Sequence, residues 1–194
     1  MAVGALPDPP PAATAAAEWR AVFGNANPVA IEVGPGHGEF LRAMAQARPD
    51  WNFLAIERSA ARTRAITHQL ELAATGNARV LCTDAACLLA LLPAGCVSAL
   101  FVQFPDPWWK RRHQRRRLWT LAFAATVRRV LAPAATIEFL TDVADTFHLG
   151  LACLDGDGGL ERVTVGCLPS HGTSFAHKAL RRGGTIYHSL HRRR

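Results

Sequence analysis

The chain has 194 residues, about half of them apolar, and its 22 Lys and Arg against 15 Asp and Glu give a formal net charge of +7. This composition excludes a mainly disordered chain, and the length suits one domain with a full hydrophobic core. No apolar run reaches the roughly 18 residues that a membrane-spanning helix needs. The five cysteines include no C-x-x-C pair, which gives little support to a zinc site or a disulfide framework.

Residues 1–24 are rich in Ala and Pro and are expected to form a leader with a short helix near residues 15–23. The start of this leader has no cation, so it lacks the charged beginning of a secretory signal. We therefore expect a cytoplasmic protein in which residues 25–194 form a single domain.

The rest of the chain alternates between apolar strand patterns and helical patterns. The predicted strands are residues 29–33, 53–57, 79–82, 99–103 and 136–140. The predicted helices are residues 39–47, 60–73, 86–92, 115–131 and 143–154. Alternation of this kind predicts an α/β fold with a largely parallel sheet and helices on both faces. Residues 160–165 and 185–190 could pair as two final antiparallel strands, although periodicity alone leaves this open.

A glycine-rich turn follows the first predicted strand. Gly34, Gly36 and Gly38 are spaced G-x-G-x-G, which differs from the G-x-G-x-x-G of dinucleotide-binding turns. Glycines at such a turn let the backbone approach a ligand closely. Glu32, at the strand end, could receive an ammonium group but would repel a pyrophosphate. The pattern favours S-adenosylmethionine over NAD, while an ordinary strand-to-helix turn remains an alternative.

The next two predicted strands also end near an acid. Glu57 ends the second strand, where a carboxylate could accept both ribose hydroxyl hydrogens of an adenosine. Asp84 follows the third strand, where it could reach the adenine amino group. Each acid alone could be a helix N-cap, which is a common role for Asp. Three acids at three successive strand ends favour a cofactor pocket.

The segment from Phe104 to Leu118 combines a carboxylate, two indole rings and a dense group of cations. Asp106 lies between two prolines, which restrict the backbone around it. Trp108 and Trp109 follow, and six cations fall within eight residues: Lys110, Arg111, Arg112, Arg115, Arg116 and Arg117. Indole faces can stack on bases, and clustered cations neutralise phosphates. The segment predicts chemistry on a base within a nucleic acid, and the alternative is a turn that opens a basic, solvated helix.

With these motifs the chain resembles the bacterial tRNA (guanine-N7)-methyltransferase family, from about Pro28 to Tyr187. The resemblance implies a single Rossmann-like class I methyltransferase domain with a mostly parallel seven-stranded sheet and an antiparallel C-terminal strand pair. It also implies S-adenosylmethionine as the cofactor and tRNA as the partner. The positions that match the family's functional residues are the cofactor acids Glu32, Glu57 and Asp84, the active-site acid Asp106, and the substrate-side residues Lys110, Asp142 and Thr173.

Two positions depart from the family pattern. Ala176 stands where the family has Glu in a late Thr-x-x-Glu element, and Trp109 stands where Pro is usual. Ala176 can neither accept a hydrogen bond from its side chain nor balance a charge. Two alternatives therefore stay open: a methyltransferase of the same fold that acts on another RNA or a small molecule, or a non-catalytic RNA-binding relative.

Guanine N7 already has an in-plane lone pair, so the reaction needs alignment more than a general base. We expect Asp106 to accept hydrogen bonds from guanine N1 and the exocyclic amine. Lys110 and the arginines Arg111, Arg112 and Arg115 are expected to hold phosphate. If the fold brought these cations together with those of residues 178–194, they would form one positive face, although a frayed terminus is the favoured interpretation for the last three arginines. The histidine spacing predicts no metal site, and no pattern indicates an oligomeric state.

Overall fold

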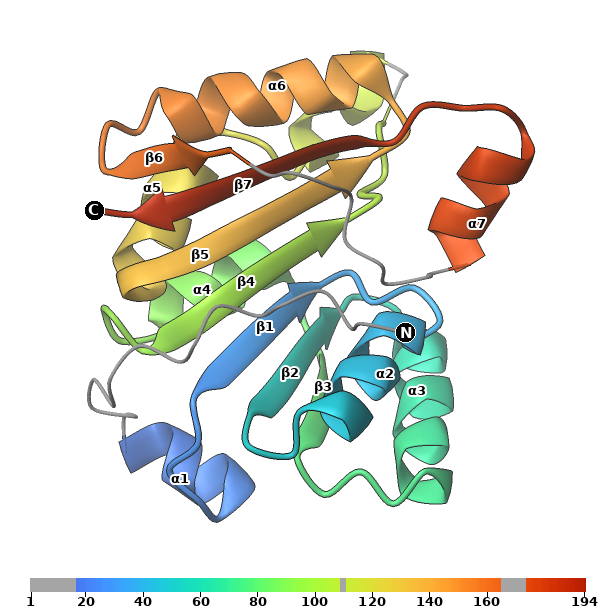
Figure 1. Cartoon of the computed structure of the whole chain (residues 1–194), viewed down its shortest axis with the longest axis vertical. Helices are drawn as coiled ribbons and strands as arrows, with labels where there is room; N and C mark the ends of the chain where they lie inside the picture. The colour runs from blue at the N-terminus through green and yellow to red at the C-terminus, as the bar shows by residue number, and fades with distance from the viewer. Residues whose placement is uncertain (1–16, 109–110, 165–173) are drawn as a thin grey trace.

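The computed structural model describes residues 17–108, 111–164 and 174–194, and its centre is a seven-stranded sheet (Figure 1). The strands are β1 (Val29–Val33), β2 (Asn52–Glu57), β3 (Ala78–Cys82), β4 (Val97–Gln103), β5 (Leu131–Thr141), β6 (Leu160–Val163) and β7 (Tyr187–Arg193). Their order in the sheet is β3-β2-β1-β4-β5-β7-β6. Strands β1 to β5 are parallel, and β7 runs antiparallel to both β5 and β6. The predicted mostly parallel sheet with an antiparallel C-terminal pair is confirmed.

Helices cover both faces of the sheet, as the alternating sequence pattern predicts. The helices are α1 (Ala17–Phe23), α2 (Glu39–Ala47), α3 (Ala60–Leu72), α4 (Ala85–Leu91), α5 (Leu121–Val130), α6 (Ala144–Asp155) and α7 (Ser174–Arg181). Helices α2 and α3 pack on the face seen in Figure 1, over β2 and β3, while α4 and α5 lie behind the sheet. Residues of β1, β2 and β4 are all buried because both faces of these strands are covered.

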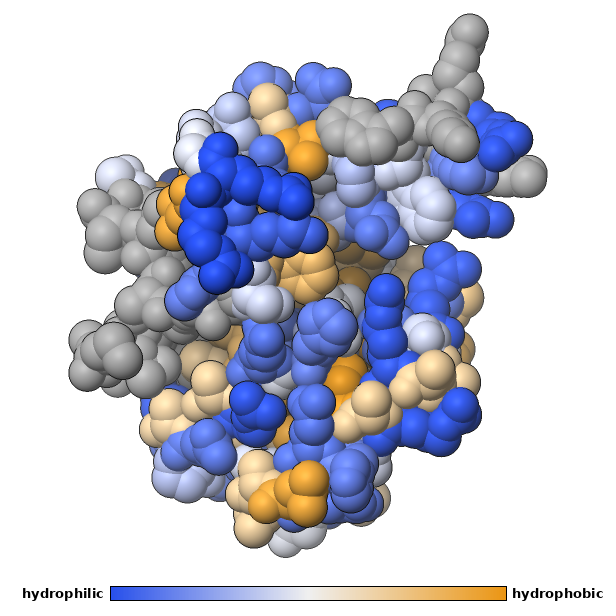
Figure 2. Space-filling view, turned by 90° about the vertical axis from the view of Figure 1, so that its right-hand side faces the viewer, coloured by the Kyte–Doolittle hydropathy of each residue, from blue (hydrophilic) through white to orange (hydrophobic). Residues whose placement is uncertain are grey.

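The carboxyl ends of the parallel strands β1, β2, β4 and β5 lie side by side, and we name this side of the sheet its carboxyl edge (Figure 1). Figure 2 turns the molecule so that this edge faces the viewer, and it shows hydrophilic side chains gathered around a recess in which apolar atoms are visible. Open parallel sheets place their ligand sites at this edge.

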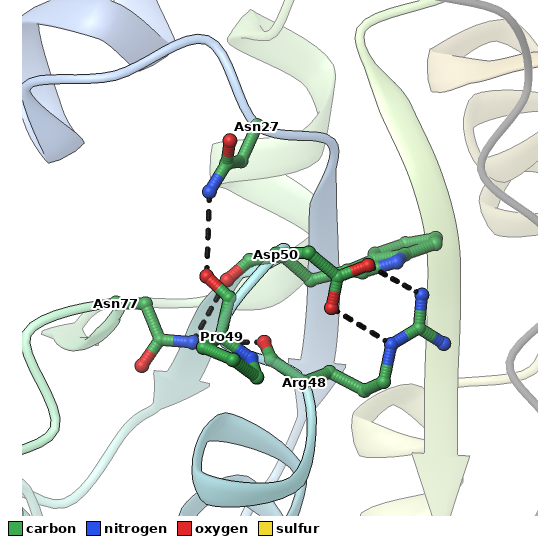
Figure 3. Close-up of polar contacts among 6 residues, drawn as sticks. Asn27, Arg48, Pro49, Asp50 and Asn77 are labelled. Atoms are coloured by element: carbon green, nitrogen blue, oxygen red, sulfur yellow. Dashed lines mark hydrogen bonds and ion pairs between the residues drawn. The ribbon is translucent and has the colours of Figure 1, made fainter.

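The opposite edge of the sheet is fixed by side-chain hydrogen bonds to backbone carbonyls. Asn77 Nδ2 donates to the carbonyls of Ala45, Arg48 and Trp51 at 3.1, 3.1 and 2.8 Å, as the close-up of Figure 3 shows in part. Arg48 also pairs with Asp50 at 2.8 Å across the turn between α2 and β2. These contacts connect the amino end of β3 to the turn between α2 and β2, on the side of the sheet away from the carboxyl ends of the parallel strands.

One predicted helix differs from the structure, and one observed helix has no predicted counterpart. Residues 115–131 were expected to form one helix, but a 3₁₀ helix, η1 (Arg111–Arg116), comes first and α5 begins only at Leu121. The start is set by Thr120, whose hydroxyl accepts a hydrogen bond from the Phe123 N–H at 3.0 Å. The dense cations before Thr120 repel one another at helical spacing, which disfavours extending α5 toward them. Helix α7 was not predicted.

Cys82 and the C-terminal arginines lie in surroundings that differ from those expected. Cys82 was expected to be a small core residue, but it is exposed because β3 is an edge strand of the sheet. The C-terminal arginines were expected to fray, yet β7 extends through Arg193, and Arg192 pairs with Glu161 of β6. None of the helices in the described part of the chain has both the length and the apolar character needed to cross a bilayer.

Candidate active site

Two pockets flank the loop that follows β4 at the carboxyl edge. The first, which we name the glycine-loop pocket, is lined by Glu32, Gly34, Pro35, His37, Glu39, Phe40, Gln103, Phe104 and Phe175. The second, which we name the proline-loop pocket, is lined by Pro105, Asp106, Pro107, Arg117, Leu118, Trp119, Asp145, Thr146 and Leu149. Because Phe104 lines one pocket and Pro105 the other, the two meet at this loop.

The backbone of the glycine-loop pocket has the conformation that its sequence predicts. Gly34, Gly36 and Gly38 have φ values of 72°, 58° and 74°, which side-chain-bearing residues rarely adopt. Gly38 N-caps α2, and its N–H donates to the Pro35 carbonyl at 2.8 Å. Apart from its own chain neighbours, the described residues place no heavy atom within 4 Å of the position that a Cβ on Gly34 would take.

Glu32 is the most unusual group of the glycine-loop pocket. Its residue is only 4% exposed, and burial raises the pKa of its carboxyl to about 8, while a hydrogen bond from the Leu41 backbone acts in the opposite direction. Within the described residues, Glu32 Oε2 is buried and has no hydrogen-bond partner. A buried carboxyl oxygen without a partner is costly, and a cationic ligand would offset that cost.

Helix α7 packs over the same pocket through Phe175. The Phe175 ring lies nearly parallel to the Phe104 ring, with centroids 6.1 Å apart, and to the His37 ring at 6.4 Å. A Cβ on Gly36 would come within 2.9 Å of Phe175 Cε2, so the absence of a side chain at Gly36 makes room for the ring. The Ser174 N–H also donates to the Glu39 carboxylate. Sequence reasoning did not identify Phe175 as a site residue, because its neighbours lie more than 70 positions away in the chain.

The other two predicted cofactor acids have local partners. Glu57 is buried at the end of β2, and its carboxylate accepts a hydrogen bond from the Ser59 N–H at 2.7 Å. Asp84 caps α4 by accepting hydrogen bonds from the N–H groups of Ala86 and Cys87 at 3.0 and 3.2 Å. The capping role that the sequence left open for Asp84 is therefore present in the structure.

The loop of the proline-loop pocket carries Asp106 on an irregular backbone. Phe104 and Trp108, on either side of the loop, have φ values of 50° and 46°, which is uncommon for residues with side chains. The Asp106 residue is exposed at the pocket. Trp108 is half-buried, and its ring contacts His113 edge-on and lies under the Arg116 guanidinium at 5.2 Å. Trp108 therefore packs against His113 and Arg116 of the basic segment and is not part of the hydrophobic core.

The predicted substrate-side residues are only partly described. Arg112 on η1 and Asp142 after β5 are exposed at the carboxyl edge. Lys110 and Thr173 lie outside the described residues, as do the side chains of Arg111 and Arg115. Within the described parts of the chain, no group of three or more His, Cys, Asp or Glu residues could hold a metal ion.

The basic residues do not gather on one face. Helix α7, which contacts the glycine-loop pocket through Phe175, carries exposed Lys178 and Arg181, and exposed Arg182 follows it. The final arginines lie instead at the end of β7, which runs antiparallel to β5 and so ends at the opposite edge (Figure 1). There Arg193 donates to the Leu131 carbonyl, and Arg194 lies within ion-pair distance of Glu161. The condition for a single positive face is therefore not met for these last residues, because strand pairing carries them away from the site.

Comparisons with known proteins decide the family. Residues 26–188 match the model of a family described as "Putative methyltransferase". Over 183 residues the chain is 35% identical to the tRNA (guanine-N(7)-)-methyltransferase of Acidithiobacillus ferrooxidans, which covers 91% of this chain and 81% of that relative. The chain belongs to the tRNA (guanine-N7)-methyltransferase family.

One further member of the tRNA (guanine-N7)-methyltransferase family and one solved structure complete the comparison. The Geobacter metallireducens enzyme is 40% identical over 130 residues, which are 66% of this chain and 62% of that relative, so the match spans less than two thirds of it. The crystal structure of the 16S rRNA methyltransferase KamB covers 91% of this chain and 93% of its own, with a TM-score of 0.69 and 15% identity. That likeness confirms the predicted methyltransferase fold.

Proposed function

We propose that this chain transfers a methyl group from S-adenosylmethionine to N7 of a guanine in tRNA. Membership in the tRNA (guanine-N7)-methyltransferase family supports the proposal. The structural observation that carries it is the buried Glu32 carboxyl, whose Oε2 has no hydrogen-bond partner among the described residues, beside the glycine turn. Such a group suits the ammonium of an amino acid moiety, and it would disfavour a pyrophosphate. A tRNA substrate is also consistent with the predicted cytoplasmic location.

The residues of the glycine-loop pocket fit the parts of this cofactor. When bound, S-adenosylmethionine supplies a methyl group on a positively charged sulfur. Glu32 would bind the ammonium, and the backbone of Gly34, Gly36 and Gly38 allows close approach of the ligand. Glu57 would accept the ribose hydroxyls at the end of β2 and Asp84 the adenine amino group beyond β3, in the order in which the sheet presents these strands.

On the substrate side, the chain needs to hold a base and the phosphates around it. Asp106 would accept hydrogen bonds from guanine N1 and the exocyclic amine, which adenine does not match on that edge. The residues that would contact the RNA are Lys110, Arg111, Arg112, Arg115, Asp142 and Thr173. Because N7 carries its own lone pair, these groups accelerate the reaction by orienting the base and not by removing a proton.

One observation favours a second candidate, a methyltransferase of the same fold that acts on another RNA or on a small molecule. Ala176, which stands where the family's Glu was expected, is 9% exposed on the buried side of α7. Compared with the family's Glu, the uncharged Ala176 makes α7 less polar near the glycine-loop pocket.

The test is to incubate the purified protein with S-adenosylmethionine and unmodified tRNA, digest the RNA and search for 7-methylguanosine by mass spectrometry. A matched substrate with 7-deazaguanosine, which lacks N7, should remain unmethylated. Methylation at any other atom or only of another substrate would support the second candidate. Cofactor binding without methylation of any RNA or small molecule would support a non-catalytic RNA-binding relative.

A further inference from the structure

Helix α7 carries a basic surface and also contacts the glycine-loop pocket. It lies beyond the carboxyl edge of the sheet, apart from the helices that cover the two faces (Figure 1). Lys178 and Arg181 are exposed in its last turn, and exposed Arg182 follows directly. We name these three residues the α7 cations. Because all three are exposed, they are accessible to a large ligand.

The two sides of α7 differ in character. Ala176 and Ala179 are buried, whereas Lys178 and Arg181 are exposed. The members of each pair are three residues apart, so they lie on one side of the helix. The alanine side therefore faces the protein, and the side with the cations faces solvent.

The α7 cations have no partner of opposite charge within the described part of the chain. None of the ion pairs found there includes an α7 cation. The sequence has no Asp or Glu from residue 163 to residue 194, so this segment supplies no carboxylate side chain of its own. At the far end of β7, by contrast, Arg192 and Arg194 both pair with Glu161. Clustered, exposed cations without counter-charges favour a polyanionic ligand.

The first turn of α7 fixes the helix to the glycine-loop pocket. Phe175 lines that pocket, and its ring lies nearly parallel to the Phe104 ring at 6.1 Å between centroids. The Ser174 N–H donates to the Glu39 carboxylate at 2.5 Å. With a rise of about 1.5 Å per residue, the first two α7 cations lie about 4.5 and 9 Å along the helix axis from Phe175. A phosphate held there would belong to a nucleotide close to the cofactor's proposed position.

We propose that the α7 cations bind phosphates of the tRNA, so that α7 holds the RNA backbone beside the glycine-loop pocket. This inference rests on the proposed function, and it adds α7 as a second RNA contact besides the basic segment of residues 110–117. Contacts to phosphates position a nucleic acid but do not read its bases. The α7 cations therefore contribute affinity and orientation, whereas the choice of base belongs to the residues around Asp106.

The first experiment compares two double variants that each remove two positive charges. Lys178→Ala/Arg181→Ala removes two α7 cations, and the control Arg192→Ala/Arg194→Ala removes two exposed arginines from the far end of β7. Filter binding of unmodified tRNA is measured at several salt concentrations. The α7 variant should raise the Kd by about 10-fold and reduce the salt dependence by about two phosphate contacts, with the control within about twofold of the wild type. Equal Kd values for the two variants would overturn the proposal.

The second experiment reads the contact at a single side chain. Lys110 and Lys178 are the only lysines in the sequence, so acetylation of each can be followed separately by mass spectrometry after digestion. Saturating tRNA should slow the acetylation of Lys178 by about fivefold, in the wild type and equally in Arg192→Ala/Arg194→Ala. An unchanged rate at Lys178 with tRNA bound would refute the contact, even if the α7 variant bound RNA weakly.

Binding and methylation together distinguish failure of this inference from failure of the proposed function. Both experiments measure RNA binding and do not depend on methyl transfer. A wild-type protein that forms no 7-methylguanosine, but loses tRNA affinity when the α7 cations are replaced, would lose the function and keep the RNA surface. A Lys178→Ala/Arg181→Ala protein that forms 7-methylguanosine with an unchanged KM for tRNA would keep the function and reject the surface.

Discussion

Glu32 on β1 and Asp106 after the neighbouring strand β4 are both carboxyl groups of the candidate site, yet Glu32 is buried and Asp106 is exposed. Glu32 lies inside β1, one residue before its end, and faces the side of the sheet that α2 covers. Asp106 lies three residues beyond the end of β4 and is exposed. Burial raises the pKa of Glu32 to about 8, because a charge there would lie away from water.

The contrast between the two carboxyl groups indicates which of the two pockets is preorganised before a ligand binds. The glycine-loop pocket has a fixed backbone, a buried acid and the Phe175 ring across it. The loop that carries Asp106 contains two prolines and lies between two residues with positive φ, and the Asp106 residue is exposed. We infer that Glu32 contributes mainly to cofactor affinity, whereas Asp106 contributes mainly once a base is present.

The largest expected effect separates these roles. Asp106→Ala should lower kcat/KM for methyl transfer to tRNA by about 1000-fold, because the base loses the group that orients it. The Kd of S-adenosylmethionine should stay within about twofold of the wild type, since Asp106 is exposed outside the glycine-loop pocket. Single-turnover transfer and calorimetric titration give the two numbers. A parallel loss of cofactor affinity would refute the division between the pockets.

Glu32→Gln should produce the reverse pattern. Removing the buried negative charge should raise the Kd of S-adenosylmethionine by about 100-fold, because the ammonium would then be buried without a counter-charge. At saturating cofactor, methyl transfer should recover to within about 10-fold of the wild type. Asp106→Ala is the control, as it preserves binding and loses transfer. Unchanged cofactor affinity in Glu32→Gln would leave the buried acid without the role assigned to it.

The same substitution has a pH-dependent effect on the protein without cofactor. The folded-state pKa of Glu32, about 8, lies above the ordinary value of 4.5, so the folded protein retains a proton that the unfolded chain releases. The carboxyl therefore lowers stability progressively as pH rises from 4.5 to about 8. Glu32→Gln lacks this loss, and its Tm should exceed that of the wild type by about 5 °C at pH 8 while the two coincide near pH 4.5. The measurement is the Tm of both proteins by thermal unfolding between pH 4.5 and pH 8. A variant that is less stable than the wild type at pH 8 would contradict the prediction, because it would mean that the folded protein stabilises the ionised carboxylate.

A smaller effect is expected from the aromatic contact across the glycine-loop pocket. Phe175→Ala removes the ring that stacks on Phe104 and contacts the Gly36 position, so α7 should dock less firmly. The Kd of S-adenosylmethionine should rise by about fivefold, because the ring lines the glycine-loop pocket. Leu180→Ala on the same helix is the control, because Leu180 is exposed. Identical affinities of the two variants would show that Phe175 does not act on the pocket.

The sequence predicts the cofactor half of the site better than the substrate half, for a physical reason. The burial of Glu32 follows from a continuous apolar strand with a glycine turn, which is local information. The position of Phe175 depends on a helix that docks through Glu39, 135 residues earlier in the chain, and no local pattern encodes that contact. Asp106 was identified from its prolines, but the pocket beside it needs Trp119 and α6 to be brought together by the sheet.

Substitutions of single arginines are expected to have the smallest effect. They test whether tRNA binding depends on where a positive charge lies or only on the net charge of the protein. Arg112→Ala should weaken tRNA binding about threefold and reduce the salt dependence by about one phosphate contact, because Arg112 is exposed at the carboxyl edge. Arg192→Ala removes the same charge from the opposite edge, where the side chain pairs with Glu161, and should leave both quantities unchanged while lowering Tm slightly. Filter binding at several salt concentrations compares the variants directly. Equal losses would mean that RNA responds to net charge alone, whereas a loss confined to Arg112 would place the RNA at the edge that holds both pockets.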